Sequence, residues 1–225
     1  MVNENIKNVI RQRMERTAEA LRNNCMEAYV VADEKEAKSK VEELLFEGAA
    51  IGVGGSATLD ECGVLELIKD KKYRFIDRYE SGISADEVKR RHIAALGADV
   101  FLSGTNAITE KGELYNVDGT GNRIAAMAFG PDSVIIVAGY NKIVKDLDDA
   151  IKRVKMVAAP ANTKRLSCHS YCQAFGECKA LAKGEAGMTD GCMTDGRICC
   201  DYLILARQRR HGRIKVILVE KELGF

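Results

Sequence analysis

The residues best suited to chemistry are cysteines, six of which lie between Cys168 and Cys200 in a chain that has eight. A chain of 225 residues buries roughly 70% of its unfolded surface without covalent cross-links, so disulfides are not needed for folding. In a reducing compartment, grouped cysteines are more often metal ligands or redox-active thiols than structural disulfides. We therefore expect the segment 165–200 to be a metal-binding loop.

Two cysteine pairs in this loop have spacings that can bring four sulfur atoms to one point. Five residues separate Cys172 from Cys178, and six separate Cys192 from Cys199. Thiolates suit zinc or an iron–sulfur cluster such as [4Fe–4S], and they exclude magnesium and calcium. The spacings match neither a zinc ribbon nor the Cys-x2-Cys-x2-Cys run of ferredoxins. We favour iron–sulfur; zinc is the alternative, and free or oxidised thiols on a loop are a third reading.

A glycine-rich turn in the first quarter of the chain is a candidate anion site. The apolar run Ala49–Val53 leads into Gly54-Gly55-Ser56, and Thr58 follows at the start of a helix. Backbone N–H groups and a hydroxyl at such a turn favour phosphate or carboxylate. The turn lacks the lysine of a P-loop, and the alternative is a tight turn with Ser56 as a helix N-cap.

A second polar segment, 103–130, places ligand-type side chains among five glycines. Its candidate ligand-binding residues are Thr105, Asn106, Asn116, Gly119, Thr120, Asn122 and Arg123. Asp118 is the candidate catalytic acid or base, and Arg123 is suited to a ligand carboxylate. Because ligands of open α/β sheets bind at the carboxyl ends of strands, we expect this segment beside the first turn. The alternative is that Asp118 and its neighbours only stabilise turns.

Isolated cysteines and histidines carry weaker signals. Cys25 and Cys62 stand apart in sequence and are interpreted as small packing residues. His92 falls on the apolar face of a predicted helix, which favours a half-buried histidine over a ligand. His169, between two cysteines of the loop, is the histidine with a metal context.

The elements that position these residues follow an alternating pattern of strands and helices. Apolar patterning predicts strands at 28–31, 49–53, 73–76, 99–102, 133–138, 202–206 and 214–219. Helices are expected near 6–21, 37–45, 84–97 and 147–159, the last ended by Pro160. We predict a single α/β domain, 1–225, with an open, mainly parallel sheet flanked by helices. The last two strands, after the cysteine loop, are expected to form a hairpin with antiparallel pairing.

Charge and hydropathy exclude some classes of partner. Lys and Arg number 34 and Asp and Glu 33, which leaves a formal charge of +1. No global field therefore recruits nucleic acid or an anionic membrane surface. No apolar run approaches the roughly 18 residues of a membrane span, and the charged N-terminus has no signal-peptide pattern. We expect a cytoplasmic protein, with homo-oligomerisation left open.

Several segments together carry a recognisable set of motifs. They are Ser103–Arg123 (SGTNAITEKGELYNVDGTGNR), Phe129-Gly-Pro131, Ala138–Val144 (AGYNKIV), Ala158–Leu166 (AAPANTKRL) and Arg213–Val219 (RIKVILV). In these motifs the chain resembles the LUD-domain proteins, the lactate-utilization family once described as a domain of unknown function. The resemblance runs through nearly the whole chain. It implies the fold shared by sugar-phosphate isomerases, glucosamine-phosphate deaminases and CoA-transferases.

The resemblance also bears on the cysteines. Similar sequences carry a Cys-x5-Cys-x2-Cys-x6-Cys tail ending in Arg-Ile-Cys, and the four paired cysteines fall on those positions. The middle spacing is thirteen residues here, between Cys178 and Cys192. Cys168 and Cys200 remain alternatives for any one of the four ligands.

Three functions follow from this resemblance and from the residues. The first is a part in lactate oxidation to pyruvate, with a small carboxylate or phosphorylated ligand, an iron–sulfur centre and a redox partner subunit. The second is a sugar-phosphate or CoA-ester isomerase or transferase, with Asp118 as acid or base and a structural zinc. The third is a ligand-binding subunit without enzymatic activity.

Overall fold

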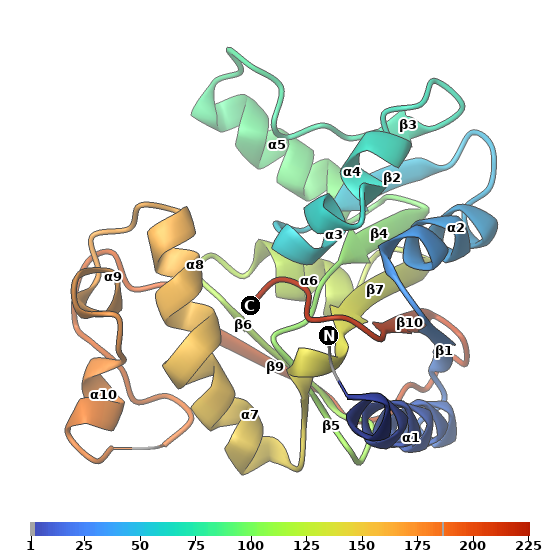
Figure 1. The fold of residues 1–225 in the computed structure, drawn as a ribbon. Coiled ribbons are helices and arrows are strands. Elements are labelled where there is room, and N and C mark those ends of the chain that lie inside the picture. Colours follow the sequence, from blue (N-terminus) through green and yellow to red (C-terminus); the bar gives the residue numbers. More distant parts are fainter. Residues whose placement is uncertain (1–2, 186) are drawn as a thin grey trace.

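The computed structural model describes residues 3–185 and 187–225. Its centre is a six-stranded sheet with the strand order β1-β10-β7-β4-β2-β3, in which each neighbouring pair is parallel (Figure 1). The strands are β1 (Glu27–Val31), β2 (Ala50–Val53), β3 (Arg74–Phe75), β4 (Val100–Ser103), β7 (Ser133–Gly139) and β10 (Ile214–Val219). The predicted α/β class with an open, mainly parallel sheet is confirmed.

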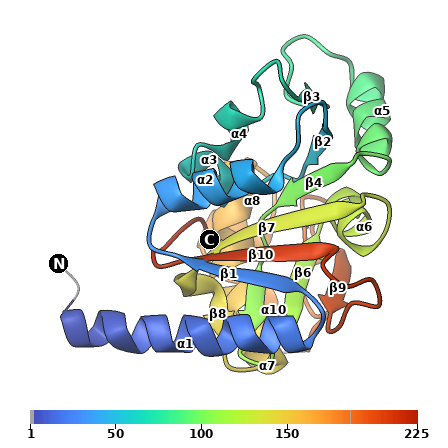
Figure 2. The ribbon, with the colours of Figure 1, turned by 90° about the vertical axis from the view of Figure 1, so that its right-hand side faces the viewer.

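Helices cover both faces of this sheet. They are α1 (Glu4–Asn23), α2 (Glu34–Leu44), α3 (Ala57–Glu61), α4 (Val64–Leu67), α5 (Ala85–Ala95) and α6 (Asn122–Ala128). Side chains alternate along a strand, so Val134 and Ile136 of β7 pack in the cluster of α1, α5 and α6, whereas Ile135 and Val137 pack with α2, α3 and α4. Figure 2 shows α1 and α2 on opposite sides of β1 and β10. A strand buried on both faces needs a continuous apolar run, and β7 has one.

A smaller sheet lies on the α1 face and has the order β8-β5-β6-β9. Its strands are β5 (Ala107–Thr109), β6 (Leu114–Asp118), β8 (Ile143–Val144) and β9 (Asp201–Leu205). Strand β6 pairs antiparallel with β5 and β9, and β8 pairs parallel with β5. Ile108 and Leu114 face the main core, whereas Tyr115 packs with Val154 on the other side. The predicted antiparallel additions are thus present as a second layer.

The helix expected to end at Pro160 continues beyond it, so that prediction is wrong. Helix α7 (Leu147–Arg153) passes through a π-helical turn, η2 (Val154–Ala158), into α8 (Ala159–Arg165). Pro160 lies at the start of α8, directly after the π-helical turn. The π turn absorbs the interruption of the hydrogen-bond ladder. Figure 1 shows α7 and α8 as one rod beside the cysteine loop.

The prediction of a C-terminal hairpin is also wrong, although both of the predicted strands are present. Strand β9 pairs with β6 in the small sheet, and β10 inserts between β1 and β7 in the large one. The buried pattern of β10 suits the centre of a parallel sheet, whereas β9 is largely half-exposed. The cysteine loop between α8 and β9 carries the short helices α9 (Tyr171–Phe175) and α10 (Lys179–Ala182). No helix in the described ranges has the length and apolar character of a membrane span.

Candidate functional site

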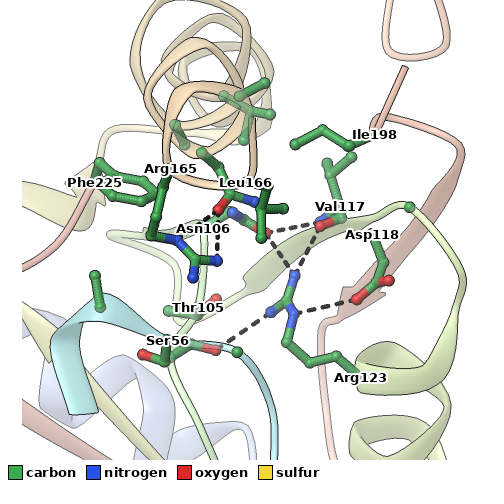
Figure 3. A pocket seen from close by; sticks show the side chains of 18 of the residues that line it. Ser56, Thr105, Asn106, Val117, Asp118, Arg123, Arg165, Leu166, Ile198 and Phe225 are labelled. Atoms are coloured by element: carbon green, nitrogen blue, oxygen red, sulfur yellow. Dashed lines mark hydrogen bonds and ion pairs between the residues drawn. The ribbon is translucent and has the colours of Figure 1, made fainter. Parts of the chain in front are cut away.

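A pocket of about 300 Å³ lies where the carboxyl ends of β2 and β4 meet the small sheet and α8. Parallel strands deliver their following loops to one edge of a sheet, which is where ligands of α/β proteins bind. The predicted ligand-type residues that line this pocket are Gly55, Ser56, Thr58, Thr105, Asn106, Asp118, Gly119, Thr120, Asn122 and Arg123. The two polar segments, far apart in sequence, are therefore brought together (Figure 3).

Two residues of the predicted set lie behind the pocket wall. A Cβ on Gly54 would sit 2.9 Å from the Arg123 side chain, so the glycine leaves room for that arginine. Asn116 is fully buried, and its Oδ1 accepts a hydrogen bond of 2.7 Å from Arg123 Nη1. Both residues help to position Arg123, and neither lines the pocket itself.

Ser56 caps α3, as its alternative interpretation proposed. Its Oγ accepts a hydrogen bond of 3.3 Å from the backbone N–H of Leu59. The hydroxyl also faces Gly104, where an added Cβ would come within 2.8 Å of it. The turn after β2 therefore approaches the turn after β4 closely, and Ser56 lines the pocket while it caps the helix.

Arg123 and Asp118 form the most buried ion pair among the described residues. Arg123 Nε lies 3.3 Å from Asp118 Oδ2, with the two side chains 11% and 10% exposed. Arg123 Nη2 donates to Asn106 Oδ1 and to the carbonyl of Val117. Burial lowers the pKa of Arg123, and the Asp118 carboxylate offsets part of that shift. Because protein acceptors already use these donors, a ligand carboxylate at Arg123 would compete with Asp118 (Figure 3).

Lys142 is a pocket residue to which the sequence analysis assigned no role. It follows β7, is 3% exposed, and its Nζ donates a 2.9 Å hydrogen bond to Thr58 Oγ1. Burial and the nearby charges of Arg153 and Arg123 lower the pKa of Lys142 to about 7. A polar segment after an apolar strand, here Tyr140–Lys142 after β7, is the pattern that could have identified it.

Two further arginines approach the glycine turn. An added Cβ on Gly55 would lie 3.0 Å from Arg78 Nη2 and 3.8 Å from Arg165 Nη2. Arg78 Nη1 is 3.0 Å from His92 Nε2, and burial together with Arg78 lowers the pKa of that histidine. Figure 3 shows Arg165 pointing into the pocket from α8. His92 is half-buried as predicted and also lines the pocket, although it lies 36 residues after Ser56.

The charges around this pocket are unbalanced. Among the described residues, four basic side chains line it, namely Arg78, Arg123, Lys142 and Arg165, and the acidic side chain that lines it is Asp118. Asp118 is already paired with Arg123. Buried Arg78 Nε has no hydrogen-bond partner within residues 3–185 and 187–225. A small anion is the ligand that this excess positive charge favours.

The four predicted metal ligands line a second, smaller cavity of about 30 Å³. They come from α9 (Cys172), the start of α10 (Cys178) and the loop before β9 (Cys192 and Cys199). In the part of the chain that the structure describes, Cys168, Cys200 and His169 do not line it. Across the same ranges, no three His, Cys, Asp or Glu side chains are already arranged to hold a metal ion.

The thiols of this cavity differ in their ease of ionisation. Burial, together with the neighbouring Cys172 and Cys178, raises the pKa of Cys199 to about 12. Burial also opposes ionisation of Cys192, but hydrogen bonds from Thr194 and the Tyr171 backbone, with the charge of Arg197, hold its pKa below the ordinary value. Sulfur ligation would therefore require a cation that stabilises several thiolates together.

The two cavities share a wall. Val154, Ala159, Ile198 and Cys199 each line both of them. A group bound among the cysteines would thus be separated from a ligand in the larger pocket by one layer of side chains. The π-helical turn supplies Val154 to this layer.

The chain is similar to several proteins of solved structure. A DUF162 family protein from Deinococcus radiodurans matches at a TM-score of 0.49 and 15% identity, with 93% of this chain and 98% of that chain covered. The delta and beta proteins of eIF2B from Chaetomium thermophilum match at a TM-score of 0.35 with 19% and 17% identity. These two matches cover 50% and 52% of this chain, and 48% and 44% of theirs. No curated protein matches the chain. The LUD domain family matches residues 14–219, and the chain therefore belongs to the LUD-domain family.

Proposed function

We propose that this LUD-domain protein binds a small organic anion, a carboxylate or a phosphorylated compound, in the 300 Å³ pocket. The observation that carries the proposal is the excess of positive charge on the pocket wall. Two guanidinium groups, of Arg78 and Arg165, converge on the turn at Gly55, and no described carboxylate pairs with either. Guanidinium groups bind carboxylate and phosphate with paired N–H donors, which matches this arrangement.

The proposal extends to a metal centre in the smaller cavity. Four cysteine sulfurs around one space are the ligands that zinc or iron–sulfur chemistry requires, so the donor set fits such a group. Cys172, Cys178, Cys192 and Cys199 would hold it. An iron–sulfur cluster would supply one-electron transfer beside the anion pocket, whereas zinc would stabilise the loop.

Membership of the LUD-domain family supports a place in lactate utilization. A pocket for a small carboxylate next to a redox centre suits oxidation of lactate to pyruvate. Lactate oxidation releases two electrons, so the chain would need a redox partner subunit or an external acceptor. Asp118, the carboxylate of the pocket, is the candidate acid or base. We propose that this reaction takes place in the cytoplasm.

Anion binding is tested with lactate, pyruvate and inorganic phosphate by titration calorimetry. The Arg78→Ala variant should weaken binding by about tenfold or more, since a charge-assisted hydrogen bond contributes about 1.5–3 kcal/mol. The matched control is Arg74→Ala, because Arg74 is 72% exposed and pairs with Asp99 at the surface. Equal affinity of all three proteins, or absence of binding by the wild type, would refute the anion pocket.

The metal centre is tested by iron, sulfide and zinc analysis of anaerobically purified protein. Cys178→Ser and Cys192→Ser should lose most of the metal, whereas Cys168→Ser and Cys200→Ser should retain it. The latter two cysteines lie in the same loop but do not line the cavity, which makes them matched controls. Equal metal content in all five proteins would contradict the assigned ligands.

The second candidate is an isomerase or transferase acting on a sugar phosphate or CoA ester, with a structural zinc. The size of the thiol cavity favours this alternative, because about 30 Å³ holds about one or two water-sized bodies. A single ion fits that space better than a cluster of several irons. A colourless protein with one zinc would select this candidate, and a brown protein with iron and sulfide would select the first.

A further inference from the structure

Two lysines of the described chain are buried, Lys142 and Lys155, and of these Lys142 lines the 300 Å³ pocket. No described carboxylate lies within ion-pair distance of the Lys142 amine. The hydrogen bond recorded for the amine is the one donated to Thr58 Oγ1. The Thr58 hydroxyl in turn donates its own hydrogen to the carbonyl of Leu223, at 3.4 Å. The Thr58 hydroxyl therefore accepts a hydrogen bond from Lys142 and donates none to it. The lone pair of the neutral Lys142 amine is thus left free by Thr58.

The 300 Å³ pocket reaches this residue, because Lys142 lines it together with Thr58 and Gly104. Gly104 has no side chain, so its backbone lies close to the amine, and an added Cβ would come within 3.7 Å of Lys142 Nζ. The guanidinium groups of Arg123 and Arg153 disfavour a further positive charge here. A desolvated lysine beside other cations is the setting in which an amine becomes a nucleophile.

We propose that Lys142 attacks the carbonyl carbon of a small carbonyl compound that carries a carboxylate or phosphate group, and forms an imine with it. A carbon–nitrogen bond forms, the carbonyl carbon–oxygen bond breaks, and the two amine hydrogens leave with the oxygen as water. No oxidant or reductant is required for this step. The proposal deepens the proposed function, on which it rests, because the anionic group would occupy the arginine-lined part of the same pocket.

This chemistry narrows the ligand class. A hydroxy acid such as lactate has no aldehyde or ketone carbon with which the amine could form an imine, whereas the corresponding 2-oxo acid has a ketone carbon beside its carboxylate. The site would then discriminate between the two members of such a pair by a covalent bond. A phosphorylated aldehyde or ketone presents the same two groups with a different anion.

The test is reductive trapping with sodium borohydride, which converts an imine into a stable secondary amine. Wild-type protein is treated with pyruvate, with dihydroxyacetone phosphate or with lactate, and adducts are located by peptide mass spectrometry. We expect an adduct on Lys142 with at least one carbonyl compound and none with lactate. Lys142→Arg keeps the positive charge but should lose the adduct, whereas Lys145→Arg, at an exposed lysine three residues on, should keep it.

The outcomes separate this inference from the proposed function. Calorimetric binding of pyruvate or phosphate without any trapped adduct overturns the imine and leaves the anion pocket intact. An adduct that persists in Lys142→Arg, or that maps to another lysine, also overturns it. Absence of both binding and adduct refutes the anion pocket, and the imine with it. Mapping of the wild-type adduct to Lys142 supports the inference even if the arginine variant does not fold.

Discussion

At the scale of single residues, Lys142 couples the pocket to the stability of the protein. Its pKa is about 7 in the folded chain, against an ordinary value of 10.5, because of burial and then of Arg153 and Arg123. Glu61 and Cys62 act in the opposite direction and only reduce the shift. Between pH 7 and pH 10.5 the unfolded chain holds more protons at this residue. The free energy of unfolding should therefore rise with pH across that window.

Replacement of this lysine should remove that dependence. Lys142→Met is expected to raise the free energy of unfolding by on the order of 3 kcal/mol below pH 7, where the buried ammonium must be accommodated. The gain should shrink as the pH approaches 10.5. Urea titrations at several pH values measure both effects, with the exposed Lys145→Met as control. A gain that does not change with pH would contradict the assignment.

Single residues also show what could be predicted from sequence. Ser56, Thr105 and Asp118 stand in glycine-rich polar segments after apolar strands, so their convergence followed from the rule for strand ends. Arg78 and Arg165 could not be predicted, because surface helices and loops are full of arginines. Their convergence on one glycine depends on how distant segments pack, and local spacing carries no information about that.

At the scale of elements, the contact of α1 with the β5–β6 turn depends on one glycine. Gly112 has φ +79°, and a Cβ there would lie 2.6 Å from the Ala20 backbone in α1. Gly112→Ala should lower the free energy of unfolding by about 3 kcal/mol, from backbone strain together with overpacking. Gly48 has the same φ of +79° with no atom within 4 Å of the added Cβ, so Gly48→Ala isolates the strain. Equal losses in the two variants would show that the contact with α1 is unimportant.

Helices and strands were predicted well where burial determines the hydropathy pattern. They were predicted poorly where the outcome depends on which strands pair or on whether a helix continues. The apolar run of β7 identifies a strand buried on both faces whatever its partners are. Strand β10 was recognised for the same reason. Its pairing with β1 and β7 joins segments that are far apart in sequence, and the hydropathy pattern does not specify such a pairing. Pro160 was misinterpreted because a π turn can carry a helix past a proline.

At the scale of the whole molecule, the chain crosses between its two sheets repeatedly. Strand β4 belongs to the large sheet, β5 and β6 to the small one, β7 again to the large one, and β8 and β9 to the small one before β10 returns. Neither sheet can be completed without the last strands of the chain. We therefore predict that the two sheets unfold together, as expected of a single domain.

Cooperative unfolding can be measured with two probes. Far-UV circular dichroism reports the helices, and tyrosine fluorescence reports sites such as Tyr115 in the small sheet. In urea with a chelator and a reductant present, we expect one transition with coincident midpoints. Two separate midpoints would contradict a single cooperative domain.

The shared wall of Val154, Ala159, Ile198 and Cys199 has a thermodynamic consequence. If loading of the cysteine cavity shifts these side chains, the affinity of the neighbouring pocket for its anion changes by some factor. Linkage then requires the anion to change the affinity of the cysteines for their metal by the same factor. The layer of side chains that separates the two cavities would thus also couple ligand binding at one site to metal binding at the other.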